Sequence, residues 1–320
     1  LFMNITILGC GRWGSFHAWY AHRIGHNVTL WGRPGSPHLA ELISQRQNEY
    51  LHLPLGIALT ADLTAALAGA DIIIISISAQ QLRSLAKQIR ATRLTHMPFV
   101  LCMKGLEKGS GKRLSTVMKE ELGEDVRTVV WVGPGHVQEF LSGMPNCMVM
   151  ASDNKERTRR IADIFSSSLI RFYYGTDLLG TEIGAAAKNV YGIAAGMLDG
   201  FHYSSLKGAL MARGTHELSR LVAAMGGSAM TVYGLSHLGD YEATLFSQHS
   251  NNRRFGEDFI LQKPFHKLAE GVYTCEALMD LSSQWQVELP ITQAIYDIIF
   301  QHKDPAEELR TLFLRSQKEE

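Results

Sequence analysis

One run in the first half of the chain constrains the fold more than any other feature. Residues 71–77 read DIIIISI, so apolar β-branched side chains occupy consecutive positions instead of alternating ones. In a strand, consecutive side chains point to opposite faces of the sheet. Both faces around this strand must therefore be covered, which is typical of a parallel sheet with helices on each side.

Similar apolar runs alternate with helical patterns through the first half. The strand candidates are Asn4–Leu8, Asn27–Trp31, Asp71–Ile77, Phe99–Met103 and Thr128–Val132, with Asn146–Ala151 and Ile170–Tyr174 as two further strands at the far edge. Helical patterns between them include Ser15–Arg23 and Gln80–Arg90. This alternation predicts a Rossmann-type α/β domain with a doubly wound parallel sheet, over residues 1–175.

The pattern changes after Gly175, where strand-like runs stop and long helical patterns begin. Residues 176–201 form one long stretch rich in Gly and Ala, so other backbone segments can approach it closely. Further helices are expected at Leu206–Met225, Thr274–Trp285, Ile291–Gln301 and Pro305–Ser316. The sequence therefore predicts an all-helical second domain over residues 176–320.

Charge and cysteine usage exclude several classes of protein. Lys plus Arg equals Asp plus Glu, 31 each, so no bulk field attracts nucleic acid or an anionic membrane. No apolar run approaches the roughly 20 residues that span a bilayer, and a secretory signal is lacking. The four cysteines lie far apart, and the histidines form no ligand set, so we expect reduced cytosolic thiols and no metal site.

The loop after the first strand carries glycines in the order G-x-G-x-x-G, at Gly9, Gly11 and Gly14. Because it follows a strand and opens a helix, it matches a dinucleotide-binding loop. Gly9 would allow a tight turn, Gly11 the approach of backbone N–H groups to a pyrophosphate, and Gly14 close packing of helix on strand. The alternative is a glycine-rich turn without a ligand.

The end of the second strand bears on which dinucleotide is bound. NAD-specific sites usually carry Asp or Glu here, to hold the ribose 2′-hydroxyl. This chain has Gly32 and then Arg33, and a guanidinium pairs with a 2′-phosphate that a carboxylate would repel. The pattern favours NADP, with NAD possible if Arg33 is only a solvated loop residue.

Two lysines are candidates for chemistry. Lys104 directly follows a predicted strand, at the edge of the sheet that faces the ligand crevice in such folds. Lys188 lies among Ala and Gly in GAAAKNVYG, on a helix predicted to be buried. Burial of an unpaired ammonium is costly, so Lys188 is either paired or has a lowered pKa. A lowered pKa suits a general acid and base that exchanges a proton with a carbinol oxygen.

Simpler interpretations of the same residues stay open. Lys188 could extend its ammonium to solvent from a helix edge. Asp240, which follows the glycine-rich stretch GLSHLGD, could be a helix N-cap, a substrate ligand, or both.

Taken together, the motifs resemble those of the NAD(P)-dependent glycerol-3-phosphate dehydrogenases. The resemblance runs along nearly the whole chain, through GCGRWG, MKGLEKG, VGPGHVQE, KNVYGIAAGMLDG, YGLSHLGD and SNNRRFG. It implies a Rossmann domain followed by an all-helical domain, a cytoplasmic homodimer, and reduction of dihydroxyacetone phosphate to sn-glycerol 3-phosphate for phospholipid synthesis.

The resemblance also assigns residues by motif. It implies Lys188 as proton donor and acceptor, with Lys104 and Asp240 as its catalytic partners. Implied cofactor contacts are Gly9, Gly11, Arg12, Trp13, Gly14, Arg33, Tyr50, Lys104, Val137, Asn251, Leu268 and Glu270. Implied substrate contacts are Lys104, Gly133, Gly135, Lys188, Asn189, Asp240, Thr244, Ser250, Asn251, Asn252 and Arg253.

Several positions depart from the family pattern. Asn251 stands where the family has an arginine that holds substrate phosphate, and Gly135 stands where it has Ser or Thr. Asn cannot reproduce a charge-assisted contact of arginine. We therefore expect weaker phosphate binding, a compensating cation at Arg253 or Arg254, or a different 2-keto or 2-hydroxy substrate. A further alternative is a non-catalytic dinucleotide sensor.

Overall fold

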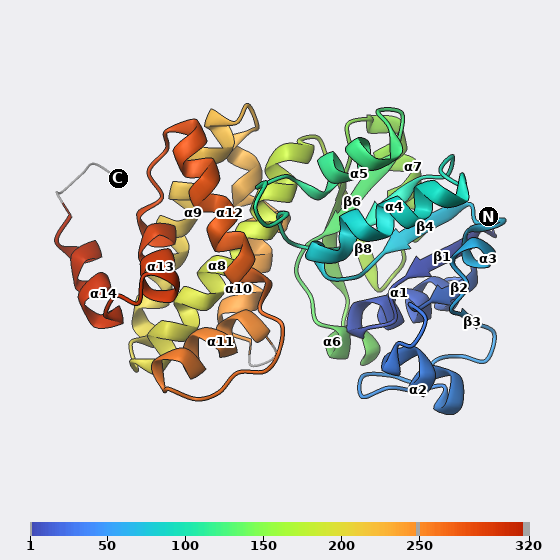
Figure 1. Cartoon of the computed structure of the whole chain (residues 1–320), viewed down its shortest axis with the longest axis horizontal. Helices are drawn as coiled ribbons and strands as arrows, with labels where there is room; N and C mark the ends of the chain where they lie inside the picture. The colour runs from blue at the N-terminus through green and yellow to red at the C-terminus, as the bar shows by residue number, and fades with distance from the viewer. Residues whose placement is uncertain (1, 248–249, 316–320) are drawn as a thin grey trace. The chain divides into compact units, whose positions relative to one another are not determined.

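The chain folds into two compact units in the computed structural model, which describes residues 2–247 and 250–315, apart from the side chains of residues 242 and 243 (Figure 1). Unit 1 consists of Leu1–Met103 and Leu114–Leu178, and unit 2 of Lys104–Arg113 and Leu179–Glu320. The segment Lys104–Arg113 thus groups with the helical unit although it follows a strand of unit 1. The sequence pattern did not indicate this.

Unit 1 contains an eight-stranded sheet in the order β3-β2-β1-β4-β5-β6-β7-β8. The strands are β1 (Asn4–Leu8), β2 (Asn27–Trp31), β3 (Ala58–Thr60), β4 (Ile72–Ile75), β5 (Phe99–Leu101), β6 (Thr128–Val132), β7 (Asn146–Ala151) and β8 (Ile170–Gly175). Neighbours from β3 to β6 are parallel, β7 is antiparallel to β6, and β8 is parallel to β7. The predicted Rossmann-type fold is confirmed, with two extra strands at the predicted edge.

The isoleucine run has the predicted environment. All four residues of β4 are buried, and β4 pairs with β1 on one side and β5 on the other. The sequence missed β3, because this edge strand has three partly exposed residues and no periodic pattern. It also did not indicate the antiparallel direction of β7, since direction depends on the connection that precedes a strand and not on its own residues.

The helices of unit 1 follow the strands along the chain and pack on the sheet. They are α1 (Arg12–Arg23), α2 (Pro37–Gln45), α3 (Leu63–Leu67), α4 (Leu82–Thr92), α5 (Leu114–Leu122), α6 (Val137–Leu141) and α7 (Lys155–Phe165). Aromatic rings from α1, α6 and α7 gather with Trp131 of β6, whose ring lies 4.9 Å from Phe172 and 5.3 Å from Phe165. These contacts fix α1, and therefore the loop that precedes it, on the sheet.

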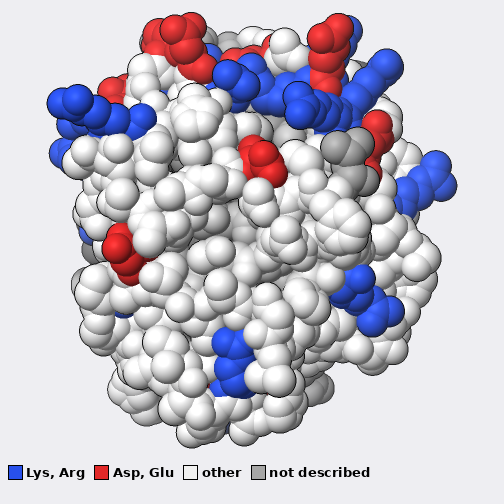
Figure 2. Space-filling view, turned by 90° about the vertical axis from the view of Figure 1, so that its right-hand side faces the viewer, with Lys and Arg blue, Asp and Glu red and all other residues white. Residues whose placement is uncertain are grey.

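Charges on the surface of unit 1 are mixed. Figure 2 shows a face on which basic and acidic side chains gather along the upper edge, with few charges elsewhere. Ion pairs of unit 1 join Arg83 to Glu120 and Glu121, and Lys119 to Asp153. Within residues 2–247 and 250–315, no helix is both long enough and apolar enough to cross a membrane.

Unit 2 is helical and is built around α8. Its helices are α8 (Leu178–Gly200), α9 (Lys207–Ala224), α10 (Asp240–Leu245), α11 (Asn251–Ile260), α12 (Glu270–Trp285), α13 (Pro290–Phe300) and α14 (Pro305–Phe313), with shorter turns at Ser204–Leu206, Ala229–Tyr233 and Leu235–Gly239. Nearly every residue of α8 is buried, as expected for a helix that is surrounded by others. The predicted helices are confirmed, except that Ser316, the predicted end of the last one, lies outside the described residues.

Glycines let α11 approach α8 closely. A Cβ added at Gly196 would lie 1.8 Å from the carbonyl oxygen of Arg253, and one at Gly256 would lie 2.0 Å from that of Ile193. Backbone therefore occupies the space of both missing side chains. The predicted close approach of another segment to the small-residue stretch is confirmed, and it fixes the start of α11 relative to α8.

We expect Gly256→Ala to lower the free energy of unfolding by roughly 1–3 kcal/mol, because the new methyl group would overlap backbone that cannot move independently. Urea denaturation of the purified protein measures the change. Gly208→Ala is the matched control, because a Cβ at this position of α9 would meet no atom within 4 Å. It should leave stability unchanged or raise it by up to about 1 kcal/mol. Equal losses for both variants would contradict the close-packing argument.

Candidate active site

The glycine loop of unit 1 has the geometry that the sequence predicted. Gly9 has a φ of 117°, and a Cβ there would lie 2.2 Å from the carbonyl oxygen of Ser76. A Cβ at Gly14 would lie 1.8 Å from the carbonyl oxygen of Gly9, so loop and helix touch through backbone. A Cβ at Gly11 would meet no described atom within 4 Å, so packing does not require this glycine. An open side at the start of α1 fits a bound pyrophosphate.

Arg12 places a cation beside this loop. It is the first residue of α1, its Nη2 donates to Oε1 of Gln138 over 2.6 Å, and its guanidinium lies 5.6 Å from the centre of the Tyr50 ring. Burial lowers the pKa of Arg12. Arg12 thus contacts both Tyr50 and α6, which starts at the buried Val137.

Two further cofactor candidates of unit 1 are Arg33, after β2, and Trp13, in α1. Arg33 is exposed directly after β2, and its carbonyl accepts a hydrogen bond from Ser36, the N-cap of α2. Trp13 packs edge-on against Phe16, with ring centres 5.5 Å apart. Arg33 is therefore an exposed residue in a turn that a backbone hydrogen bond closes.

The two glycines after β6 are required by their surroundings. Gly133 and Gly135 have φ values of 136° and 134°, which side chains rarely adopt. A Cβ at Gly135 would lie 2.5 Å from the ring of Phe140, which itself stacks on Phe16 at 5.2 Å. Gly135 in place of the family's Ser or Thr is therefore matched by an aromatic ring in the space of the missing side chain.

In unit 2, the three residues predicted to be catalytic lie together. Lys188 is buried in the middle of α8, and its Nζ donates to Oδ1 of Asp240 and to Oγ1 of Thr244, both over 2.8 Å. Lys104 donates to the other oxygen of Asp240, Oδ2. One buried carboxylate is thus shared by two ammonium groups, which we call the lysine–aspartate cluster. The alternative of a lysine that extends to solvent is excluded for Lys188.

Two side chains hold the segment that carries Lys104 against α8. Nδ2 of Asn189, the next residue on α8, donates to the carbonyl of Lys104 over 2.9 Å. Arg113, at the end of the same segment, pairs with Glu182 on α8 over 2.8 Å. The segment that carries Lys104 is therefore bound to α8 at both ends.

Burial and charge work in opposite directions in this cluster. Burial lowers the pKa of Lys188 to about 8; the charge of Asp240 counteracts the shift, and that of Lys104 adds to it. Burial alone would raise the pKa of Asp240, but the two ammonium groups lower it overall. Asp240 therefore stays ionised, and Lys188 is both paired and lowered in pKa, so the two alternatives that the sequence left open for this lysine occur together.

The prediction that Asp240 caps a helix is wrong. Asp240 is the first residue of α10, its N-cap is Gly239, and no side chain bonds to the first turn there. The carboxylate turns to the lysines instead, because two charge-assisted hydrogen bonds in a buried place are worth more than one bond to a backbone N–H. A single turn of π-helix, Leu235–Gly239, precedes Asp240.

The start of α11 holds the remaining substrate candidates. Ser250 is its N-cap, with Oγ accepting from the backbone N–H of Arg253 over 3.2 Å. Oδ1 of Asn252 accepts from the N–H of Gly271, 2.9 Å away at the start of α12. Asn251 is the first residue of the helix and is partly exposed.

Arg253 is committed to internal partners. Its Nη1 lies 2.6 Å from Asp199 and 3.0 Å from Glu257, and its Nε donates to the carbonyl of Ser247. Lys207 also pairs with Asp199, over 2.7 Å. The charge of Arg253 is thus balanced within unit 2, whereas Arg254 is exposed and forms no side-chain ion pair with the described residues.

Two neighbours of the candidate residues were missed from the sequence. His237 is fully buried, donates from Nδ1 to the carbonyl of Gly184 over 2.8 Å, and has its pKa lowered to about 4 by burial. Its position three residues before Asp240 was the available signal, since helical spacing brings such residues together. Asp199 could have been noticed as the only carboxylate in the apolar stretch GIAAGMLDG.

The last two cofactor candidates flank the start of α12. Leu268 is about half exposed, at 47%, and Glu270 is the first residue of the helix, where its carbonyl accepts from Oγ1 of Thr274. No group of three or more His, Cys, Asp and Glu side chains in the described part of the chain is placed to hold a metal ion.

A glycine loop between a strand and a helix of a Rossmann-type unit, with a buried lysine–aspartate cluster in a helical unit, defines a dinucleotide-dependent dehydrogenase. Comparison with known proteins gives the particular family. Residues 4–158 match the model of the NAD-dependent glycerol-3-phosphate dehydrogenase N-terminus, and residues 177–310 match that of its C-terminus. The chain belongs to the NAD-dependent glycerol-3-phosphate dehydrogenase family.

Similar proteins support this membership over the full length. The chain is 38% identical to a glycerol-3-phosphate dehydrogenase (NAD(P)+) of Prosthecochloris aestuarii, over 99% of this chain and 100% of the relative. It is also 38% identical to the enzyme of that name from Geobacillus kaustophilus, over 99% of this chain and 96% of the relative. The crystal structure of a glycerol-3-phosphate dehydrogenase from Coxiella burnetii has a TM-score of 0.91 at 28% identity, and covers 98% of this chain and 99% of that one.

We expect the buried ammonium of Lys188 to leave a signature in the pH dependence of stability. The pKa of Lys188 is lowered to about 8 in the folded chain, against about 10.4 for a free lysine. Between these values the unfolded chain binds more protons, so stability should rise with pH. Below the lower value the burial penalty of Lys188 is fully present.

Urea denaturation at pH values from about 8 to about 10 measures this rise. Lys188→Met should flatten the curve relative to the natural protein, because the titrating group is gone. Lys87→Met, which removes an exposed lysine of α4, should leave the slope unchanged. A slope that is the same in all three proteins would contradict a lowered pKa of Lys188.

Proposed function

We propose that the chain catalyses the reversible reduction of dihydroxyacetone phosphate to sn-glycerol 3-phosphate with NADPH or NADH, a step that feeds glycerophospholipid synthesis. The observation that carries the proposal is the buried cluster in which Asp240 is shared by Lys104 and Lys188. A protein that only binds a dinucleotide has no use for a desolvated lysine whose pKa is close to neutral.

The cluster supplies the proton and the electrostatic support for the reaction. When bound, the reduced nicotinamide provides a hydride for the carbonyl carbon. The electron pair of the C=O bond moves to oxygen, which takes a proton from the ammonium of Lys188, and Lys188 then regains a proton from water. Lys104 stabilises the negative charge that develops on this oxygen. Thr244 and Asp240 orient the Nζ of Lys188 towards the substrate.

Charge balance also favours an anionic substrate. With both lysines protonated, the cluster carries two positive charges and one negative charge, so it has an excess of one positive charge in a buried place. A phosphorylated ketone is attracted to such a site more than a neutral one. This excess compensates in part for Asn251, whereas Arg253 is held by Asp199 and Glu257.

A second candidate keeps the chemistry and changes the substrate. Asn251 replaces the family's phosphate-binding arginine. Arg253, which could have supplied the missing positive charge, is paired with Asp199 instead. A 2-keto compound without phosphate would need neither group. The two candidates share Lys188 and differ only in what the start of α11 binds.

Finer properties follow as part of the proposal. Arg33, exposed at the end of β2, favours the 2′-phosphate of NADPH over the free hydroxyl of NADH. The family resemblance supports a homodimer, and the free state of all four cysteines is in keeping with a reducing cytoplasm.

Dihydroxyacetone phosphate and unphosphorylated dihydroxyacetone, tested side by side, distinguish the two candidates. We expect loss of NADPH absorbance with the phosphorylated substrate and a kcat/KM at least about tenfold lower without phosphate, because a charge-assisted contact is lost. Lys188→Ala should abolish turnover and leave NADPH binding intact. Turnover of some other 2-keto compound, with none of dihydroxyacetone phosphate, would refute the first candidate.

Asn251→Arg sharpens the same experiment. If the substrate is dihydroxyacetone phosphate, the new guanidinium should raise kcat/KM by improving phosphate binding. If the natural substrate lacks phosphate, the variant should turn it over no better than the natural protein. Arg254→Ala, at an exposed position of the same helix, tests whether this neighbour already supplies the charge.

Arg33→Ala tests the cofactor preference. Loss of a contact to the 2′-phosphate should raise KM for NADPH about tenfold or more and leave KM for NADH nearly unchanged. Steady-state kinetics with both dinucleotides measure the ratio. Equal changes in KM for NADPH and for NADH would show that Arg33 does not contact the 2′-phosphate.

A further inference from the structure

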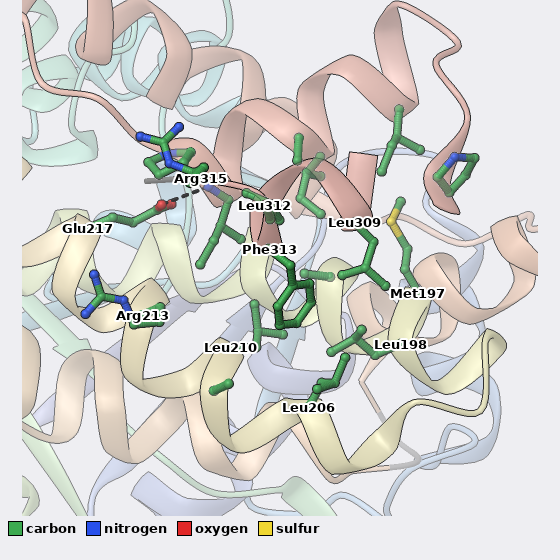
Figure 3. A pocket seen from close by; sticks show the side chains of 18 of the residues that line it. Met197, Leu198, Leu206, Leu210, Arg213, Glu217, Leu309, Leu312, Phe313 and Arg315 are labelled. Atoms are coloured by element: carbon green, nitrogen blue, oxygen red, sulfur yellow. Dashed lines mark hydrogen bonds between the residues drawn. The ribbon is translucent and has the colours of Figure 1, made fainter. Parts of the chain in front are cut away.

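Unit 2 contains a cavity of about 570 Å³ that none of the groups described so far uses. Helices α8, α9, α13 and α14 line it (Figure 3). Its volume lies within the roughly 300–1,000 Å³ that is usual for small-molecule sites. We call it the α14 groove, because α14 forms its outer wall.

The groove has an apolar end and a cationic end. Along α9 the lining residues follow helical spacing: first Leu206, Ala209 and Leu210, and then Arg213, His216 and Arg220. In Figure 3, Arg213 and Arg315 lie at one end, whereas Met197, Leu198 and Leu206 lie at the other. The lining is thus amphipathic along its length.

The cationic end carries an excess of positive charge. Arg220 donates to the carbonyl of Glu288, and Arg315 pairs with the carboxylate of the same residue over 2.9 Å. Arg213 is exposed and forms no side-chain hydrogen bond or ion pair with the described residues. Burial and the charges of Arg213 and Arg220 lower the pKa of His216, as expected next to cations.

Among the described residues that line the groove, Glu217 is the one with a carboxylate, and this carboxylate is already satisfied. Glu217 accepts hydrogen bonds from the N–H groups of Ile291 and Thr292, from Oγ1 of Thr292 and from the hydroxyl of Tyr191, over 2.9–3.1 Å. Its charge is spread over the first turn of α13 and is not available to the arginines. An anion at this end would share Arg315 with the Glu288 carboxylate and would meet the exposed Arg213 directly.

The outer wall is the least buried helix of unit 2. Within α14 no residue is buried, although Asp304 caps the helix and Pro305 starts it. Leu309, Leu312 and Phe313 face the groove, and Phe313 is 65% exposed. Because α14 buries little of its own surface, an apolar ligand beneath it would remove these apolar side chains from water and stabilise the helix.

We propose that the α14 groove binds a long-chain fatty acid, with the carboxylate at Arg213, Arg220 and Arg315 and the acyl chain along Leu210 towards Leu198. The inference is independent of the proposed dehydrogenase function. The apolar half removes the chain from water, and the arginines fix its direction. A neutral apolar ligand would form no charge-assisted hydrogen bond with the guanidinium groups, whereas a carboxylate would.

Equilibrium dialysis of radiolabelled palmitate against the full-length protein tests the proposal. We expect one palmitate per chain. Ala209→Trp should abolish binding, because the indole fills the apolar half from an exposed position and disturbs no buried residue. Ala212→Trp, on α9 but outside the groove lining, is the matched control and should bind palmitate normally.

The charged end has its own test. Arg213→Ala should weaken palmitate binding about tenfold, and Arg160→Ala, an exposed arginine of α7, should leave it unchanged. Hexadecanol, which lacks the charge, should compete poorly. Equal competition by hexadecanol, absence of saturable palmitate binding, or normal binding to Ala209→Trp would each overturn the proposal. So would a sedimentation coefficient that Ala209→Trp alters without palmitate, since the groove would then belong to a second copy of the chain.

Discussion

The shared carboxylate of Asp240 is the interaction on which the rest of unit 2 depends. Lys188 and Asp240 are buried and Lys104 is only partly exposed, and hydrogen bonds among the three and from Lys188 to Thr244 compensate for the loss of water. Removing one partner of such a buried pair costs roughly 3–5 kcal/mol. Two features hold these groups in place. One is the close packing of α11 on α8, and the other is the attachment of the Lys104 segment to α8 at two points.

The same arrangement explains how a buried lysine can have a pKa close to neutral. Lys188 is buried on a helix that is covered on all sides, and it has Lys104 as a like-charged neighbour. Asp240 prevents the pKa from falling further, so the proton remains exchangeable near neutral pH. A tuned acid thus arises from three residues that come from separate parts of the chain.

Much of the fold could be predicted from local patterns, because strands buried on both faces and helices rich in small residues leave strong signals. The bounds of β1, β2, β6 and β7 were predicted from their residues alone. The direction of β7, the role of Asp240 and the partners of Arg253 depend on contacts between distant residues, to which local propensity is blind. The glycine motif predicted the loop after β1 from the sequence. Only the structure showed that the ring of Phe140 fills the space in which a side chain at Gly135 would lie.

The placement of Lys104–Arg113 has a consequence for how such a protein can be divided. Neither unit is one continuous stretch of the gene product, since this segment is inserted into unit 1 but folds with unit 2. A fragment that began at Leu179 would contain Lys188 and Asp240 but lack Lys104, and with it one of the two charges that neutralise the carboxylate. Recombination therefore cannot transfer the helical unit to another nucleotide-binding domain as one continuous segment. Part of its candidate reactive centre, Lys104, comes from the segment that follows β5.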